Sequence, residues 1–203
     1  MGKVWNRENG LSPKELIVAV TGASGAVYAR TLLRYLSRQG VEIHLIPSSA
    51  GRLVYQLEIG IPLEQDLPPT VRCYNEKDFF APPASGSFSA HGMVIVPCTM
   101  GTLAAVANGL SLNLIHRAAD VCLKERRPLV VVPRETPLNR VHLRNMLKLT
   151  EAGAILLPAM PGFYHRPLGI EDIARFIVAR ILDQLGFAQD LVPPWNPNPE
   201  ILS

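Results

Sequence analysis

Residues 16–25 read Leu-Ile-Val-Ala-Val-Thr-Gly-Ala-Ser-Gly, an apolar run that ends in a turn of small residues. Apolar residues at helical spacing follow over 26–39, and Gly40 is typical of a helix C-cap. A strand, a glycine-containing turn and a helix N-terminus favour an anion site, because the first helical amides are unpaired and the helix dipole is positive there. The stretch therefore predicts an α/β fold that begins with a phosphate-binding loop; the alternative is a tight turn without a ligand.

This loop differs from a dinucleotide-binding fingerprint. Its glycines are spaced Gly22-x-x-Gly25, and the third glycine of the fingerprint is missing. The next apolar run, 41–46, ends in Pro47-Ser-Ser49, where an NAD enzyme places an acidic residue for the ribose. The loop therefore favours a mononucleotide over NAD.

Apolar runs alternate with helical patterns along the rest of the chain. We expect strands at 16–21, 41–46, 93–97, 129–133 and 155–158, and helices at 26–39, 50–58, 101–108, 113–124, 140–152 and 170–185. Prolines predict an irregular segment over 59–92. The alternation predicts a parallel sheet with helices on both faces, and ligands then bind beyond the carboxyl ends of the strands.

Length and composition indicate a single domain that associates with copies of itself. We expect a flexible leader at 1–14 and one domain at 15–203, whose proline-rich tail contributes to subunit contacts. Hydrophobic residues make up 48% of the chain and charged residues 18%. No apolar run reaches the ~18 residues of a membrane span, so the apolar surplus predicts subunit interfaces.

The cysteines, histidines and net charge argue against a disulfide-rich, a metal-binding or a nucleic-acid-binding protein. Three cysteines without CxxC spacing predict no disulfide framework and fit a reducing cytoplasm. The scattered histidines predict no metal site. The net charge of +3 is modest, and positive residues concentrate over 117–148, which favours an anionic ligand over nucleic acid.

Charged and nucleophilic residues near the predicted strand ends have competing interpretations. Arg134-Glu135 follows a buried run directly, which favours a pocket lining over a salt-bridged surface turn. Lys124, taken alone, is more typical of a solvated helix end. Arg180 lies among apolar residues, so we expect it to be buried with a partner or placed at an interface. Cys98 is interpreted as a packed small residue rather than a nucleophile.

A set of motifs identifies a family. The chain contains, in order, Thr21-Gly-Ala-Ser-Gly25, Pro82-Pro-Ala-Ser-Gly-Ser87, Pro97-Cys-Thr-Met-Gly-Thr102, Arg117-Ala-Ala-Asp120, Leu123-Lys-Glu-Arg-Arg-Pro-Leu129, Pro133-Arg-Glu-Thr-Pro137, His142-Leu-Arg-Asn-Met146 and Pro161-Gly-Phe-Tyr164. As a set and in this order, they resemble the UbiX-type flavin prenyltransferases over residues 15–195.

The resemblance implies a flavodoxin-like, Rossmann-like fold and a metal-independent transferase. Such enzymes join a dimethylallyl group from dimethylallyl monophosphate to N5 and C6 of reduced FMN, which is bound as co-substrate. The prenylated FMN serves a UbiD-type decarboxylase. The resemblance further implies a cytoplasmic homododecamer with its sites at subunit junctions, and neither nucleic acid nor membrane as partner. It leaves open which decarboxylase uses the product and whether a diphosphate also serves as donor.

The resemblance also assigns site residues. It implies catalytic roles for Ser24, Glu58, Lys124 and Glu135. It implies contacts with FMN for Gly22, Ala23, Ser24, Ser48, Thr99, Met100, Gly101, Thr102 and Arg117. It implies contacts with the prenyl donor for Phe79, Ser85, Lys124, Arg134, Glu135, Tyr164, Arg180 and Trp195. Some relatives carry Trp at position 79, so the strength with which Phe79 stabilises an allylic cation is open.

The chemistry of these residue types agrees with that assignment. A monophosphate leaves poorly, and the charges of Lys124, Arg134 and Arg180 can neutralise it. Aromatic rings attract a developing cation. One alternative is an FMN-dependent decarboxylase of the cysteine-decarboxylase type, which carries an Asn in the segment where this chain has Pro83-Ala-Ser-Gly-Ser87. Another is a flavin carrier without activity.

Overall fold

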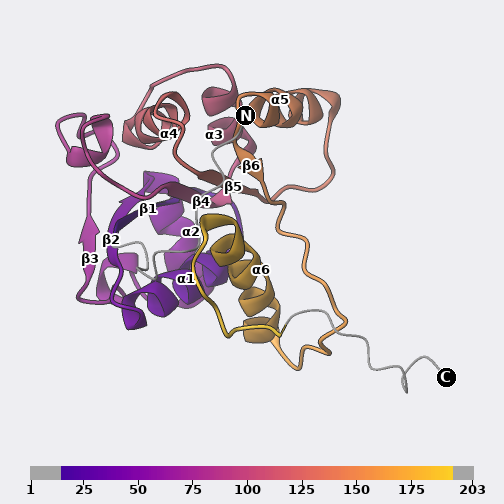
Figure 1. Ribbon diagram of the computed structural model, residues 1–203. Coiled ribbons are helices and arrows are strands. Elements are labelled where there is room, and N and C mark those ends of the chain that lie inside the picture. Colours follow the sequence, from indigo (N-terminus) through magenta and orange to yellow (C-terminus); the bar gives the residue numbers. More distant parts are fainter. Residues whose placement is uncertain (1–14, 194–203) are drawn as a thin grey trace.

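The computed structural model describes residues 15–193, so the predicted leader at 1–14 and Trp195 lie outside the described part. Its centre is a parallel sheet in the order β3-β2-β1-β4-β5-β6 (Figure 1). The strands are β1 (Glu15–Val20), β2 (Glu42–Pro47), β3 (Val71–Cys73), β4 (Met93–Cys98), β5 (Leu129–Pro133) and β6 (Ile155–Leu156). The predicted parallel α/β fold is confirmed.

Helices cover both faces of the sheet, as predicted. They are α1 (Ala26–Arg38), α2 (Ser49–Ile59), α3 (Met100–Ala107), α4 (Leu114–Lys124), α5 (Arg140–Glu151) and α6 (Ile170–Leu185), with short 3-10 turns η2 (Leu63–Gln65) and η3 (Pro82–Ala84). Helices α1, α2 and α6 contribute to the core on one face, and α3, α4 and α5 to the core on the other (Figure 1).

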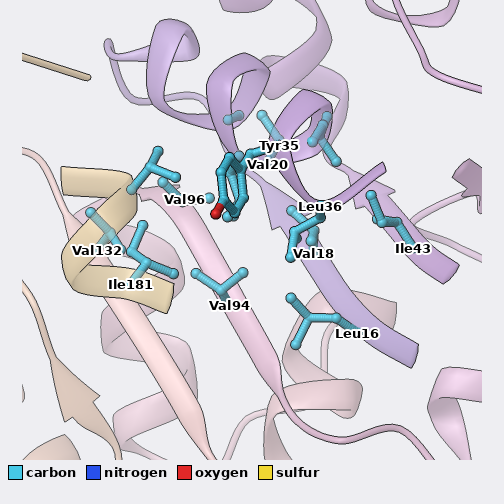
Figure 2. Close-up of a cluster of buried hydrophobic side chains, with 14 of the residues drawn as sticks. Leu16, Val18, Val20, Tyr35, Leu36, Ile43, Val94, Val96, Val132 and Ile181 are labelled. Atoms are coloured by element: carbon cyan, nitrogen blue, oxygen red, sulfur yellow. The ribbon is translucent and has the colours of Figure 1, made fainter. Parts of the chain in front are cut away.

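The central strand β1 is buried on both faces. Leu16 and Val18 pack with residues of α1 and α6 (Figure 2), whereas Ile17 and Ala19 pack with α3 and α4. A strand buried on both sides has no polar alternation, because both of its faces need apolar residues. This is why the sequence shows a continuous apolar run here.

Two parts of the sheet differ from the sequence-based expectation. The segment 59–92 is not wholly irregular, because Val71–Cys73 forms β3 and pairs in parallel with β2, Val71 opposite Ile43. This edge strand is only three residues long, and Arg72 and Cys73 are exposed, so it leaves no apolar pattern. Strand β6 spans two residues, Ile155–Leu156, instead of the predicted 155–158.

The topological switch point of the sheet lies between β1 and β4, and we call the carboxyl ends of these two strands, with the loops that follow them, the crevice. The chain leaves β1 toward β2 on one side, whereas β4 lies on the other, and ligands bind where such connections diverge. The buried Thr21 joins the two strand ends: its Oγ1 donates to the carbonyl of Pro97 (2.8 Å) and accepts from the amide of Thr99 (2.8 Å). Thr21 therefore holds the two loops that border the crevice together.

A buried carboxylate fixes α2 against α1. Asp66, whose side chain is 7% exposed, accepts hydrogen bonds from Arg30 Nε (2.7 Å), Arg34 Nη2 (2.6 Å) and the Tyr55 hydroxyl (2.7 Å). Burial would raise the pKa of Asp66, but these three hydrogen bonds and the Arg30 charge lower it below its ordinary value. The carboxylate is thus ionised in the folded protein, and it sets the position of the helix that carries Glu58.

We expect Asp66→Asn to lower the free energy of unfolding by about 2–4 kcal/mol at pH 7, since both arginines lose their counter-charge. The Asp66 pKa is lower in the folded state than in the unfolded one, so its contribution is present above the unfolded value near 3.9 and is lost as pH falls through the folded value. Urea unfolding should therefore show a mutant difference that shrinks toward pH 2. The control is Glu64→Gln, which removes an ion pair with Arg52 whose Glu64 side chain is 50% exposed and should cost under about 1 kcal/mol. A difference for Asp66→Asn that is independent of pH would contradict this role of its charge.

Candidate functional site

The loop between β1 and α1 is fixed by close packing. Gly25 has a φ of 116°, in the left-handed region that glycine adopts without strain. A Cβ on Gly22 would lie only 2.6 Å from the Cβ of Ala50 in the first turn of α2. Gly22 therefore lets α2 pack directly on the loop, in addition to the close ligand approach that the sequence predicts.

Glu58, in the last turn of α2, binds this loop. Its Oε2 accepts hydrogen bonds from the amides of Gly25 (2.9 Å) and Ala26 (2.8 Å), and the Ser24 side chain also hydrogen bonds to the carboxylate. Burial would raise the Glu58 pKa, but these hydrogen bonds and the nearby Arg134 charge lower it below its ordinary value. The structure thus brings Ser24 together with an ionised Glu58; the catalytic roles of both stay a prediction.

The three helix N-termini at this edge differ in what occupies them. Glu58 takes the first amides of α1, where the sequence predicts a ligand anion, and Glu76 accepts from the Ser49 amide of α2 (2.7 Å). Within residues 15–193, the Met100 and Gly101 amides of α3 have no hydrogen-bond partner, and a Cβ on Gly101 would meet no atom within 4 Å. The open, positive end that suits a phosphate is therefore that of α3.

The hydroxyl groups at the strand ends also cap helices. Ser48 Oγ accepts from the Gly51 amide (2.9 Å) at the start of α2. Thr99 Oγ1 accepts from the Thr102 amide (3.2 Å) and donates to the Thr102 hydroxyl (3.0 Å) at the start of α3. The hydroxyls thus have the capping role that ordinary turn chemistry predicts, and those of Thr99 and Thr102 lie at the open end of α3.

Arg134 and Glu135 follow β5, at the same edge of the sheet. The Arg134 side chain is exposed and makes no hydrogen bond or ion pair with the described part of the chain. Its charge nevertheless acts on two neighbours: it helps to lower the pKa of Glu58, and it opposes the effect of burial, which raises the pKa of the Tyr28 phenol. The free guanidinium therefore lies near the Ser24–Glu58 pair. The Glu135 carboxylate accepts from the Thr136 amide (3.0 Å) and is exposed.

The loop that contains η3 meets the end of α4. Ser85 Oγ lies 2.8 Å from Ser87 Oγ, and Lys124 forms an ion pair with Glu125. The Phe79 side chain is on the surface, 46% exposed. The structure thus places Lys124 against Gly86, the residue that follows Ser85, and Lys124 is a partly exposed cation, as its helix-end position predicts.

Arg117 of α4 has partners within its own chain. Its Nε donates to the Ala84 carbonyl (3.0 Å), and its Nη1 pairs with Asp120 (3.0 Å). The structure therefore shows Arg117 holding the η3 loop; the contact with FMN that the family resemblance implies stays a prediction.

Tyr164 and Arg180 form a separate group at the β6 edge. Tyr164 packs edge-on against Phe176 of α6, with ring centroids 5.8 Å apart. Arg180 lines a cavity of about 400 Å³ between β6 and α6, and its Nη1 pairs with Asp183 at 2.8 Å. The Arg180 side chain is 52% exposed. The expectation that Arg180 is buried in its own chain is therefore wrong, and of the two expectations only the interface remains.

The predicted residues thus fall into three groups in one chain. Ser24, Glu58 and Arg134 lie together at the crevice, Lys124 at the end of α4 lies against the Ser85–Gly86 segment, and Tyr164 lies beside α6, which carries Arg180. Because α4 and α6 cover opposite faces of the sheet (Figure 1), one copy does not bring its Lys124 to its own Arg180 through any contact shown here. A shared site between copies accounts for this separation.

Sequence reasoning missed three residues that shape the site. Thr21 joins the crevice loops, Tyr28 stands near both Glu58 and Arg134, and Arg127 binds the η3 loop. Tyr28 lies in the first turn of α1, directly after the loop that carries Ser24, and this closeness in the sequence could have indicated it. Nothing in the sequence indicates the partners of Arg127, since they are main-chain carbonyls.

The structure also bears on a thiol nucleophile, a metal site and a membrane span. Cys98 is fully buried, and burial raises the pKa of its thiol strongly, which disfavours a nucleophilic role. Among residues 15–193, no three metal-ligating side chains cluster. Over the same residues, no helix has both the length and the hydropathy that crossing a membrane requires.

Comparison with known proteins gives a consistent family. The family model described as Flavoprotein matches residues 5–182. The flavin prenyltransferase UbiX of Pseudomonas aeruginosa is 48% identical to this chain over 198 residues, which cover 91% of this chain and 95% of that protein.

Solved structures agree. A UbiX crystal structure in complex with FMN and dimethylallyl pyrophosphate superimposes with a TM-score of 0.88 at 42% identity, covering 92% of this chain and 99% of that one. A dodecameric FMN-dependent UbiX-like decarboxylase from Escherichia coli has a TM-score of 0.86 at 41% identity, and the match covers 90% of this chain and 100% of that one. An FMN-dependent cysteine decarboxylase has a TM-score of 0.61 at 18% identity, and the match covers 86% of this chain and 99% of that one. At this identity the likeness shows the fold alone.

Proposed function

The chain belongs to the UbiX flavin prenyltransferases of the flavoprotein family, and from this premise we propose how its own residues carry out the transfer. The protein is a transferase that joins a dimethylallyl group to FMN and assembles, as its E. coli relative does, into a dodecamer. Bound reduced FMN supplies the nucleophilic N5 and C6 atoms. The observation that carries our assignment is the Ser24–Glu58 pair, which lies beside the free charge of Arg134.

The residues at the crevice fit a flavin mononucleotide. The unpaired amides of Met100 and Gly101, at the positive end of α3, suit its phosphate, and Thr99, Thr102 and Ser48 add hydroxyls. Gly22, Ala23 and Ser24 then contact the ring system from the β1 loop. We assign the phosphate to α3 rather than to α1, because Glu58 already occupies the α1 amides.

The donor is held by cations from more than one copy. We place Lys124 of α4 and Arg134 after β5 on one side of the donor, and Tyr164 and Arg180 from the α6 side of a neighbouring copy on the other, which accounts for their separation within one chain. Their charges neutralise the phosphate as it leaves, and Glu135 donates or relays a proton to it. Phe79, together with Trp195, supplies aromatic walls for the allyl group. Arg117 stays a proposed contact to the FMN phosphate or ribityl chain through those of its N–H groups that its two protein partners leave free.

The decisive experiment is mass spectrometry of the flavin released after anaerobic turnover. With reduced FMN and dimethylallyl monophosphate, we expect a flavin heavier by one prenyl unit. An unchanged flavin mass at saturating substrate would overturn the function. The same assay with the pyrophosphate, which a relative binds, identifies the donor. We propose the monophosphate, because the described residues contain several cations and no acidic metal cluster.

Decarboxylation is the second candidate, since a relative at 41% identity is called a UbiX-like decarboxylase. The cysteine decarboxylase that we compared shares only the fold with this chain. Loss of CO₂ from an aromatic acid by the purified protein without any second enzyme would support it. We instead place the reaction in the cytoplasm, with the product passed to a UbiD-type decarboxylase.

A further inference from the structure

Arg127 fastens the η3 loop to the end of α4. Its Nη1 donates to the carbonyl of Phe88 (2.5 Å) and its Nη2 to the carbonyl of Gly86 (2.6 Å). The two N–H groups of a rigid guanidinium thus grip main-chain atoms two residues apart in the sequence, which a side chain with a single donor atom cannot reproduce. Arg127 forms no ion pair at contact distance within residues 15–193, so these two carbonyls are the acceptors of its side chain there, and its charge acts on the Glu125 carboxylate from a greater distance.

The end of α4 turns Arg127 toward this loop. Arg126 has a φ of 56°, a left-handed conformation that is unusual for a residue other than glycine. The amide of Arg127 then donates to the carbonyl of Cys122 (2.8 Å), a bond that closes the helix end. The chain therefore reverses at Arg126, two residues after Lys124. The Arg127 side chain then faces the segment around Gly86, against which Lys124 also lies.

The gripped segment carries part of the proposed donor site. A Cβ on Gly86 would collide with Glu125 Oε1 and would lie 2.8 Å from Lys124 Nζ, so the Lys124–Glu125 ion pair lies directly against the Gly86 main chain. Ser85, the preceding residue, has its hydroxyl next to that of Ser87. The position of the Gly86 peptide therefore sets the distance between Ser85 and Lys124, and Arg127 holds that peptide by its carbonyl.

We propose that Arg127 is a positioning residue for the prenyl donor, which it serves by holding residues 84–88 so that Ser85 and Lys124 face the phosphate together. The proposal rests on the function proposed above, because it needs those two residues to bind the donor. It predicts a specific defect: the donor site loses its shape, whereas the flavin site at α3 keeps its own hydrogen bonds.

The test compares Arg127→Gln with Arg126→Gln, which removes the same charge one residue away without removing a described hydrogen bond. For Arg127→Gln we expect kcat/KM for dimethylallyl monophosphate to fall about 10- to 100-fold, mainly through KM, with an FMN Kd within about twofold of the wild type. Arg127→Lys keeps the positive charge but not the two donor nitrogens of the guanidinium, so it should recover part of the loss. Arg126→Gln should behave as the wild type. Equal losses of FMN and donor affinity in Arg127→Gln would show a merely structural role and overturn the proposal.

Hydrogen exchange tests the same proposal without any activity. On the assembled protein, peptides that cover 82–90 should exchange faster in Arg127→Gln than in Arg126→Gln, and peptides of the β1 loop should not. If exchange at 82–90 were unchanged in Arg127→Gln, Arg127 would not hold this loop in place, and the proposal would be wrong. If instead the exchange result holds but the wild type prenylates no flavin, the failure lies in the proposed function and with it the role toward the donor.

Discussion

Glu58→Gln should lower the rate of prenyl transfer by about 10²- to 10⁴-fold, the range typical of losing a general acid–base group, while FMN still binds. The glutamine carbonyl can keep the hydrogen bonds from the Gly25 and Ala26 amides, so the start of α1 stays capped. Its amide nitrogen cannot accept a proton from Ser24. The substitution therefore removes the base and leaves the fold.

The measurement is single-turnover prenylation under anaerobic conditions, alongside thermal unfolding and flavin titration. Loss of the negative charge at a helix N-terminus should cost only about 0.3–1 kcal/mol of stability. If Glu58→Gln kept the full rate, Glu58 would be a helix cap and nothing more.

A double-mutant cycle decides whether Ser24 and Glu58 act as one unit. Ser24→Ala removes the hydroxyl that hydrogen bonds to the Glu58 carboxylate. If the pair is a unit, the double variant Ser24→Ala, Glu58→Gln should be no slower than the worse single variant, because residues that act together are not additive. Multiplied rate losses would mean that the two residues act separately. Retention of both FMN binding and full rate by Ser24→Ala would remove the catalytic role of Ser24.

The order of the elements was predictable because it follows from apolar periodicity. The buried strands β1, β4 and β5 are continuous apolar runs, and a helical pattern separates each from the next. Strand β3 was not predictable, since an exposed three-residue edge strand is held by main-chain pairing with β2 rather than by its side chains.

The site was predictable in its residues more than in its arrangement. The family resemblance identified Ser24, Glu58 and Arg134, and the structure brings these three together. The occupant of the α1 N-terminus was not predictable, because Glu58 is separated from Ala26 by 32 residues and only the packing of α2 brings it there. The sequence likewise could not place Tyr164 and Arg180 on the far side from Lys124.

Arg134→Met should lower kcat/KM for the prenyl donor by about 10²- to 10³-fold, as expected when one preorganised charge or hydrogen-bond donor to a leaving group is removed. Arg134 makes no ion pair or side-chain hydrogen bond with the described part of the chain, so its removal breaks no structural contact there. It also lies near Glu58, whose pKa its charge lowers, and Arg134→Met should therefore raise that pKa. Steady-state kinetics from about pH 3 to 9, a range that extends below the ordinary pKa of a glutamate, measure both effects at once.

Glu135→Gln is the matched comparison, because it alters the adjacent residue without removing a cation. If Glu135 supplies a proton to the departing phosphate, its variant should lose kcat with little change in KM, whereas Arg134→Met should lose both. The pH profiles should separate them too: the acidic limb belongs to a base such as Glu58, so it should move upward in Arg134→Met and stay in place in Glu135→Gln. An acidic limb that moves in neither variant would mean that Arg134 does not act on Glu58 during turnover. If both kcat and KM stayed at the wild-type values in Arg134→Met, Arg134 would be excluded from the donor site, and Lys124 and Arg180 would then have to hold the phosphate alone.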